Sequence, residues 1–330
     1  MEREIDPMSL VAPEFRAAAA EIAAQEAGSA PPTLASIAEI RNSPFFAEVE
    51  PLPDVDHFER HAPVGHGHPD VLLYVINARP GGKRPAILHT HGGGQIAGAA
   101  KNEVRRLQAL ARQLDCVVVT VEYRLAPEAT FEASIEDNYA GLRWLHSHAA
   151  ELGVDAQRIA VFGESAGGGH AAILANLATD RGEFPVAFQC LIYPMLDDRT
   201  GSTRRTPDYI GQYAWSADWN RLGWGCFLGM PPGGEDTPAV AAPSRRKDLR
   251  SLPPAFIGVG SVDLFVEEDI EYAARLIGAG VPTELIVVPG GFHGFDIFAP
   301  ETALAQAFER AKLDALRRGL GLARWTPHAG

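Results

Sequence analysis

The sequence contains little cysteine and no long apolar run. Its three cysteines, Cys116, Cys190 and Cys226, are too few and too far apart to form a disulfide framework. No stretch approaches the ~18 consecutive apolar residues of a membrane-spanning helix, and no apolar segment follows a basic start at the N-terminus. These absences predict a cytoplasmic protein that does not have a membrane as its partner.

Clusters of basic residues are also scarce. The chain has 29 Lys and Arg residues against 42 Asp and Glu residues, a formal net charge of −13. Its basic runs, Arg204-Arg205 and Arg245-Arg246-Lys247, are too short for a stripe that contacts a phosphate backbone, so nucleic acid is not an expected partner. With 46% hydrophobic and 22% charged residues, the composition is that of a soluble globular protein.

The most informative stretch is built around Ser165. A short apolar run, Ile159–Phe162, predicts a buried strand, and Gly163-Glu164-Ser165-Ala166-Gly167 follows it directly. Residues 171–178 then predict a helix. A strand, a Gly-x-Ser-x-Gly turn and a helix together are typical of a nucleophile elbow, in which a sharp turn exposes the serine hydroxyl. Alone, this short pattern is equally typical of an ordinary turn between a strand and a helix, so other parts of the chain decide.

A second glycine-rich turn lies upstream. The apolar run Ala86–Thr90 leads into His91 and the glycines Gly92, Gly93 and Gly94. Backbone N–H groups of such a loop, together with that of Ala166 after the serine, can stabilise the negative oxygen that develops when a nucleophile attacks a carbonyl group. We expect His91 to order the loop by hydrogen bonding.

The rest of the chain predicts an α/β fold with a mostly parallel sheet. Strands at 55–62 and 71–78 form an antiparallel entry, after which apolar strands alternate with helices. The predicted helices span 102–114, 134–150, 166–179, 266–279 and 303–319, and the further strands span 86–90, 116–122, 159–162, 186–193, 255–260 and 283–288. Because these strands are almost continuously apolar, we expect helices over both faces of the sheet.

Two regions do not follow this alternation. Residues 9–27 and 33–40 predict helices outside any strand–helix unit. Residues 199–243 are rich in Trp, Gly and Pro and contain no predicted strand. We interpret residues 1–50 and 199–243 as two pieces of a helical cap, so that the catalytic domain comprises residues 51–198 and 244–330.

Asp263 and His293 are the predicted partners of Ser165. A serine hydroxyl needs a base, and a histidine base needs a carboxylate that fixes its tautomer. After a nucleophile elbow the chain order is serine, acid, histidine. His293 lies in a glycine-containing loop after a predicted strand, and Asp263 likewise follows a strand. Asp263 is favoured over three acidic residues that fall in the first turns of the next helix, Glu267, Glu268 and Asp269.

A metal site is the weaker interpretation of a histidine cluster near the N-terminus. His57, His61, His66 and His68 lie close in the sequence, but no cysteine accompanies them and they lack a regular helical pairing. The chemistry predicted for Ser165 needs no metal. We therefore expect neither a metal nor another cofactor.

Taken together, the motifs resemble those of the bacterial hormone-sensitive-lipase-like (family IV) carboxylesterases of the α/β-hydrolase superfamily. The matching segments are His91-Gly-Gly-Gly94, Tyr123-Arg-Leu-Ala-Pro-Glu128, Glu136-Asp137, Leu142-Arg-Trp-Leu145, Gly163-Glu-Ser-Ala-Gly-Gly168, Tyr193-Pro194, Asp263 and His293-Gly-Phe295. The resemblance implies an α/β-hydrolase fold with a sheet of about eight strands and a helical cap whose second piece follows the sixth strand.

The resemblance also implies the roles of individual residues. It implies Ser165 as the nucleophile, His293 as the base and Asp263 as the residue that orients the base. The oxyanion donors that it implies are the N–H groups of Gly93, Gly94 and Ala166. Family substrates are mostly short-to-medium acyl esters, and members often form homodimers. We further predict that the small-molecule substrate contacts five residues, Gln95, Glu164, Tyr193, Leu264 and Phe292.

The chain departs from the family pattern at three of these five positions. Gln95 stands where an aromatic residue often follows the glycines, which makes that wall of the pocket more polar. Glu164 stands where Asp or Thr is usual, and Leu264 begins a Leu-Phe-Val run in place of Pro-Leu-Arg. These departures leave the predicted triad complete.

Two alternatives to an esterase remain open at this level. A non-catalytic small-molecule receptor on the same fold would be expected to have lost a triad residue. Acyl transfer or amide hydrolysis would use the same triad as ester hydrolysis. We expect a serine carboxylesterase that works through an acyl-enzyme intermediate.

Overall fold

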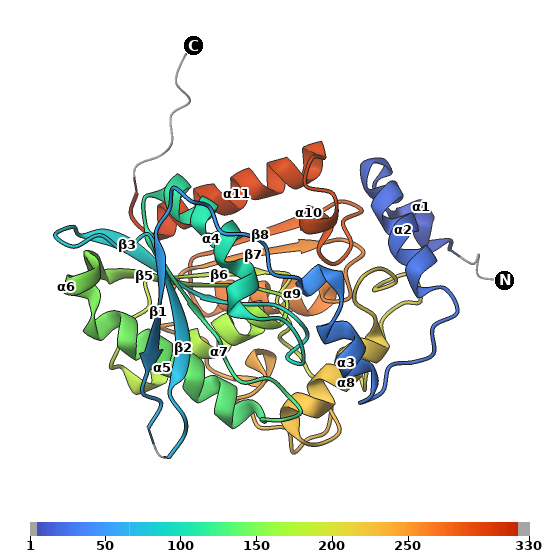
Figure 1. The fold of residues 1–330 in the computed structure, drawn as a ribbon. Coiled ribbons are helices and arrows are strands. Elements are labelled where there is room, and N and C mark those ends of the chain that lie inside the picture. The colour runs from blue at the N-terminus through green and yellow to red at the C-terminus, as the bar shows by residue number, and fades with distance from the viewer. Residues whose placement is uncertain (1–4, 66, 323–330) are drawn as a thin grey trace, which may run out of the picture.

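The computed structural model describes residues 5–65 and 67–322, and its centre is an eight-stranded sheet with helices over both faces (Figure 1). The strand order is β1-β2-β4-β3-β5-β6-β7-β8. Strand β2 (Val71–Ile76) pairs antiparallel with β1 (His57–Ala62) and with β4 (Val117–Val121). Every other neighbouring pair is parallel and involves the strands β3 (Arg84–Thr90), β5 (Val154–Glu164), β6 (Phe188–Ile192), β7 (Ala255–Gly260) and β8 (Thr283–Val288). The predicted α/β class and antiparallel entry are confirmed.

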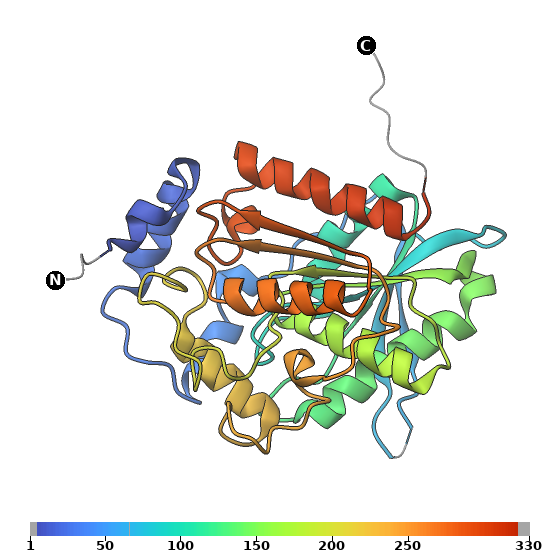
Figure 2. The same ribbon diagram turned by 180° about the vertical axis from the view of Figure 1, so that it is seen from behind.

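Helices enclose the sheet because its strands are apolar on both faces. Helices α4 (Ala100–Leu114) and α11 (Ala303–Gly319) pack on one face. On the other lie α5 (Phe131–Ser147), the short α6 (Ala149–Leu152), α7 (Ala166–Arg181) and α9 (Val266–Gly278), as the reverse view shows (Figure 2). In β4, Val118 joins the first core and Val117 and Val119 join the second, as the two-residue repeat of a strand requires.

Two segments that are distant in the sequence lie beside the carboxyl ends of the strands. The N-terminal segment contains α1 (Pro7–Leu10), the 3₁₀ turn η1 (Pro13–Phe15), α2 (Arg16–Glu26), α3 (Ser36–Arg41) and η2 (Pro44–Phe46). The insertion after β6 contains α8 (Ala217–Leu228) and ends near η3 (Pro243–Arg245). Helices α3 and α8 lie side by side in both ribbon views (Figure 1), and Ile37 shares a core cluster with Trp224 and Phe227. The exact domain boundaries stay a prediction.

The single helix predicted over residues 9–27 is wrong. The chain leaves the helical conformation at Val11 and Ala12, where Ala12 has φ −55° and ψ 139°. Ala12 precedes Pro13, and the proline ring disfavours helical geometry in the residue before it. The helix predicted over residues 134–150 is likewise divided, at His148, into α5 and α6.

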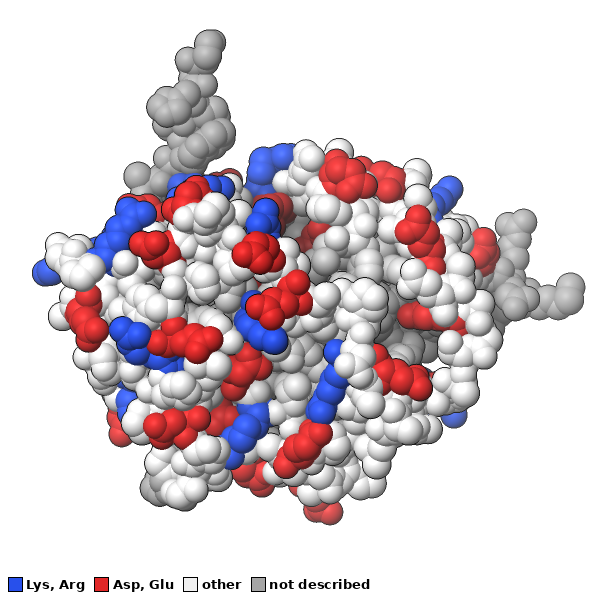
Figure 3. All heavy atoms as spheres, viewed as in Figure 1, with Lys and Arg blue, Asp and Glu red and all other residues white. Residues whose placement is uncertain are grey.

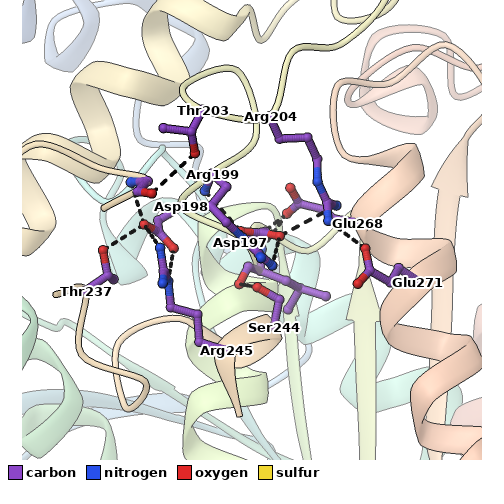
Figure 4. Close-up of polar contacts among 12 residues, drawn as sticks. Asp197, Asp198, Arg199, Thr203, Arg204, Thr237, Ser244, Arg245, Glu268 and Glu271 are labelled. Carbon is purple, nitrogen blue, oxygen red and sulfur yellow. Dashed lines mark hydrogen bonds and ion pairs between the residues drawn. The ribbon is translucent and has the colours of Figure 1, made fainter. Parts of the chain in front are cut away.

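Ion pairs of two buried carboxylates join parts of the insertion to one another (Figure 4). Asp198, at the start of the insertion, binds the Arg245 guanidinium and accepts hydrogen bonds from the Gly233 N–H (2.6 Å) and the Thr237 hydroxyl (2.9 Å). Beside it, Asp197 pairs with Arg199 at 2.7 Å. The start, middle and end of the insertion therefore meet at one carboxylate.

Glu268 of α9 extends this network toward the sheet. Its carboxylate accepts hydrogen bonds from the backbone N–H groups of Leu196 (2.7 Å) and Asp197 (3.1 Å). Burial, and then the nearby charge of Asp197, hold the pKa of Glu268 well above its usual range. Helix α9, which follows Asp263, is thereby joined to the residues at which the insertion begins.

Basic and acidic side chains are interspersed over the face shown in Figure 3. Exposed ion pairs such as Arg112–Asp54 (2.6 Å) and Lys101–Glu48 (3.3 Å) neutralise part of the surface charge. Within residues 5–65 and 67–322, no helix combines the length and the apolar character needed to cross a bilayer.

Candidate active site

Ser165 occupies a sharp turn between β5 and α7. Its backbone angles, φ 57° and ψ −124°, lie in a region that side-chain-bearing residues rarely adopt. Three backbone hydrogen bonds hold the turn: the Ser165 N–H donates to the Ile192 carbonyl (2.9 Å), and the Ser165 carbonyl accepts from Gly169 and Met195 (3.0 Å each). The serine side chain is therefore fixed at the N-terminus of α7.

The glycines around Ser165 are required by close backbone contacts. A Cβ atom on Gly167 would lie 2.0 Å from the Thr90 carbonyl oxygen, and one on Gly163 would lie 2.3 Å from the Gly167 oxygen. Neither distance is compatible with a side chain. The Gly-x-Ser-x-Gly pattern thus follows from how tightly β3, β5 and α7 meet.

The structure brings Ser165, His293 and Asp263 into one line of hydrogen bonds. His293 Nε2 lies 2.9 Å from Ser165 Oγ, and His293 Nδ1 lies 2.9 Å from Asp263 Oδ2. The second Asp263 oxygen accepts the N–H of Phe265 at 2.9 Å. Asp263 is fully buried, whereas Ser165 and His293 are 7% and 8% exposed. The carboxylate orients the imidazole, and the imidazole can accept the serine proton.

The sheet topology explains how residues so distant in the chain meet. Ser165 follows β5, Asp263 follows β7 and His293 follows β8, and these strands belong to one parallel array. The carboxyl ends of parallel strands share an edge, which is where ligands bind in open α/β sheets. All three groups reach the site from loops at that edge.

The glycine loop lies beside the serine. A Cβ atom on Gly92 would be 3.6 Å from Ser165 Cβ, and Gly93 and Gly94 have φ values of +120° and +60°. The Gly93 carbonyl turns inward to accept hydrogen bonds from Ile96 (3.1 Å) and Ala97 (2.9 Å). Within the described part of the chain, the N–H groups of Gly93 and Gly94 donate to no acceptor.

A third N–H group comes from the first residue of α7. Ala166 begins this helix, so its N–H has no acceptor within the helix. The helix N-terminus also carries a partial positive charge that favours a negative oxygen. Ala166 and the glycine loop can thus supply donors to an oxyanion next to Ser165.

His91 orders the glycine loop, as expected from the sequence. Its Nδ1 lies 2.8 Å from the Gly92 carbonyl oxygen, and its ring stacks on Tyr123 with centroids 4.2 Å apart. The Tyr123 hydroxyl donates to the His91 carbonyl at 2.7 Å. Burial lowers the pKa of His91 to about 4, so the neutral ring donates its proton to the loop near neutral pH.

Glu164, the residue before Ser165, is paired with side chains of α4 and β3. One carboxylate oxygen binds Arg106 of α4, and the other lies 3.0 Å from His89 Nε2 on β3. Burial alone would raise the pKa of Glu164, but the charges of Arg106 and His89 outweigh burial and hold the pKa well below its usual range. Both carboxylate oxygens of Glu164 are thus paired with other residues of the protein, and the contact of Glu164 with a substrate stays a prediction.

The other four predicted substrate contacts are buried around the site. Tyr193 presents its ring to His293 at 4.8 Å and donates its hydroxyl to Asp296 at 3.0 Å. Gln95 is 1% exposed with φ +70°, and its side-chain amide has no hydrogen-bond partner among the described residues. Leu264 and Phe292, which adjoin Asp263 and His293 in the sequence, are fully buried.

Sequence reasoning missed the aromatic residue nearest the glycine loop. Trp215, from the insertion, lies so close that its Cη2 would be 2.0 Å from a Cβ atom on Gly94. Its ring centroid is 6.4 Å from that of His293, and the Phe265 ring is 5.3 Å from the same imidazole. The insertion was recognised as rich in Trp, but no spacing rule indicates which indole reaches the site.

Two surface hollows of the described residues lie apart from this centre. Two surface hollows, of about 560 and 630 Å³, are lined by residues such as Arg41 and Glu128 in one and Arg143 and Arg181 in the other, and by none of the triad. No group of three or more His, Cys, Asp or Glu side chains in the described ranges is arranged to hold a metal ion. His66, part of the histidine cluster, lies outside those ranges.

Comparisons with known proteins agree with this geometry. A family model described as an alpha/beta hydrolase fold matches residues 87–297. Carboxylesterase NlhH of Mycobacterium tuberculosis is 38% identical over 244 residues, covering 72% of this chain and 74% of the relative. Esterase LipI of the same organism is 36% identical over 237 residues, covering 71% and 72%.

Solved structures extend the likeness over nearly the whole chain. The structure of a bacterial heroin esterase superposes with a TM-score of 0.81 at 36% identity, covering 96% of this chain and 99% of that one. Esterase LipW from Mycobacterium marinum gives a TM-score of 0.78 at 32% identity, with coverages of 94% and 96%. The fold of the chain therefore agrees with that of both structures.

Proposed function

The chain belongs to the hormone-sensitive-lipase-like carboxylesterases of the α/β-hydrolase fold, and we propose that it cleaves short-to-medium acyl esters through an acyl-enzyme intermediate. The observation that carries the proposal is the unbroken line Asp263–His293–Ser165, with both hydrogen-bond distances at 2.9 Å. A serine with this support can act as a nucleophile at neutral pH.

In the first half-reaction, Ser165 Oγ attacks the ester carbonyl carbon while its proton moves to His293 Nε2. The carbonyl oxygen becomes an oxyanion that accepts hydrogen bonds from Gly93, Gly94 and Ala166. When the bond between the carbonyl carbon and the alcohol oxygen breaks, His293 gives its proton to the departing alcohol. Asp263 stabilises the imidazolium throughout. The acyl group is then bonded to Ser165.

The second half-reaction returns the enzyme to its starting state. Water gives a proton to His293 Nε2 and its oxygen attacks the acyl carbon. The oxyanion forms in the same N–H cradle, whose donors are each worth about 2.7–4 kcal/mol to the transition state. The bond to Ser165 breaks, the serine oxygen regains the proton from His293, and the carboxylic acid leaves.

The test is the turnover of p-nitrophenyl butyrate by Ser165→Ala. The variant loses the nucleophile, so kcat should fall by about 10⁴-fold or more while the circular dichroism spectrum stays unchanged. Ser147→Ala is the matched control, because Ser147 is exposed and, among the described residues, its hydroxyl bonds only the Arg143 carbonyl of its own helix (2.8 Å). Turnover by Ser165→Ala at the wild-type rate would refute the proposed nucleophile.

A further inference from the structure

A loop of the insertion packs on the residues that flank Asp263 and on the residue before His293. Gly211 in this loop donates its N–H to the Val262 carbonyl (3.1 Å), and a Cβ atom on Gly211 would lie 2.8 Å from the Leu264 side chain. Two residues on, the Tyr213 ring is 5.9 Å from that of Phe292. The loop is thereby seated on both neighbours of Asp263 and on the residue before His293.

Trp215 is where this loop reaches the glycine loop. The edge of its six-membered ring would be 2.0 Å from a Cβ atom on Gly94, so it lies against the bare Cα of that glycine. Helix α8 approaches the same loop, since a Cβ atom on Gly223 would be 2.5 Å from the Gly94 oxygen. The indole therefore packs against the glycine loop, with its centroid 6.4 Å from that of the His293 imidazole.

The indole is also fixed in its orientation. Trp215 is 6% exposed, and its Nε1–H donates to the side-chain oxygen of Asn220 at 3.2 Å. Asn220 is fully buried and donates its own amide to the Thr200 carbonyl at 2.8 Å. Moving the ring would leave these buried polar groups unpaired, which is costly. A substrate chain long enough to reach the indole therefore meets a side chain that does not move aside.

We propose that Trp215 sets the upper limit on the chain length that the site accepts. The enzyme then prefers esters in which the chain that extends from the carbonyl group toward Trp215, whether acyl or alcohol, is short. This inference rests on the proposed function and specifies its substrate class. Groups that end before the indole are bound without strain, whereas longer chains displace packed side chains.

The experiment measures kcat/KM for wild type, Trp215→Ala and Trp219→Ala with two series of esters. One series lengthens the acyl chain of p-nitrophenyl esters, and the other lengthens the alcohol of acetate esters. Trp219 is the matched control, because it stacks on Trp215 (centroids 6.2 Å apart) and is only half-buried. Each methylene that gains a buried site is expected to raise kcat/KM by about fourfold.

For wild type, kcat/KM should fall with chain length in at least one series. Trp215→Ala should raise the ratio of octyl-chain to two-carbon-chain kcat/KM in that series by at least about tenfold, the effect of two or more newly buried methylenes. Trp219→Ala should keep the wild-type ratio. Unchanged ratios for Trp215→Ala in both series would overturn the inference.

A second measurement does not depend on how the variants fold. Fluorophosphonates phosphonylate an activated serine with loss of fluoride, and two sets of them lengthen either the alkyl chain on phosphorus or the alkoxy chain. Wild type should react more slowly as the chain lengthens in at least one set, and equal rates for short and long chains in both sets would also overturn the inference. If wild type hydrolyses no ester and reacts with no fluorophosphonate, the proposed function itself fails, which is a different result.

Discussion

Asp198 and Arg245, 47 positions apart in the sequence, close the two ends of the insertion against each other. Arg245 Nε and Nη2 donate to the two oxygens of the Asp198 carboxylate at 2.5 and 2.8 Å. The Asp198 side chain is fully buried and that of Arg245 is 14% exposed. This two-point contact holds together the two ends of the insertion that carries Trp215.

Arg245→Met should destabilise the protein strongly. Methionine keeps much of the arginine volume but leaves the buried Asp198 charge without its cation, a change that costs about 3–5 kcal/mol. Arg250→Met is the matched control. Arg250 also pairs with an aspartate, Asp248, but the Arg250 side chain is 77% exposed. Surface pairs contribute about 0–1 kcal/mol. Urea unfolding measures both changes, and equal costs would contradict the assignment of a buried clasp.

Asp269→Asn should stabilise the protein increasingly as the pH rises. Asp269 is fully buried on α9, and neither carboxylate oxygen has a partner among the described residues. Burial, then the charges of Glu268 and Asp263, raise its pKa well above the ordinary value of 3.8. The folded chain therefore holds a proton that the unfolded chain releases. The wild type has its full stability below pH 3.8 and loses part of it as the pH rises toward the raised pKa.

Thermal unfolding at pH 4 and pH 8 measures this difference. Asparagine does not ionise, so the variant should gain about 2–4 °C over wild type for each kcal/mol relieved at the higher pH. The gain at the lower pH should be smaller. Asp314→Asn, at an exposed position on α11, should change little at either pH. A loss of stability in Asp269→Asn at pH 8 would contradict a protonated carboxyl.

Gly167→Ala and Gly278→Ala should have opposite effects on stability, although both residues lie in helices. The Cβ atom added at position 167 would collide with the Thr90 carbonyl oxygen, at 2.0 Å, and would force β3 and α7 apart. Gly278, at the end of α9, has no atom within 4 Å of a Cβ position. Replacing a helical glycine with alanine at such a site stabilises by about 0.5–1 kcal/mol. Soluble yield and melting temperature compare the two variants.

Phe15→Ala should lower kcat through the loop that carries His293. The Phe15 ring is fully buried, 6.3 Å from that of Phe292 and 5.2 Å from that of Phe295. Removing a buried phenyl ring costs about 3–5 kcal/mol, and here the vacated space adjoins the residue before the base and the residue two positions after it. Kinetics at a temperature where the variant stays folded should show a reduced kcat and a nearly unchanged KM.

Phe45→Ala controls for the loss of an aromatic ring from the N-terminal segment. Phe45 stacks on Phe298 at 5.3 Å but is 50% exposed, so its removal should cost little in stability or rate. A Phe15→Ala variant that melts earlier yet keeps the wild-type kcat would contradict a positioning role for Phe15.

The sequence predicted that the three residues of the triad lie together, because motif patterns and the shared edge of parallel strands are enough to locate them. Strand, turn and helix patterns located Ser165, and the shared edge of parallel strands placed Asp263 and His293 beside it. The break at Ala12 was missed although Pro13 signals it. Asp269 was read as one of the acids that suit the start of a helix, whereas it faces the core. Such burial depends on which side of α9 meets the sheet, and the presence of acidic residues in a first turn does not reveal it.

The contacts of the insertion were beyond sequence reasoning for a different reason. Trp215 and Gly94 touch across more than a hundred positions, and no hydrophobic period or turn motif links them. The insertion also folds as irregular loops around one helix, where local rules are weakest. Its seating is decided by tertiary contacts such as those of Asp198, Gly211 and Asn220.

Ser165 and His293 are separated by 128 positions, and the loop above them is seated by residues from both halves of the chain. During synthesis, the serine turn leaves the ribosome 128 residues before the imidazole does, so the nascent chain carries an unactivated hydroxyl until that further stretch has been made. During refolding from denaturant the site also forms late, because contacts between distant segments form slowly. Recovery of activity therefore reports the completion of folding, later than recovery of the helical signal.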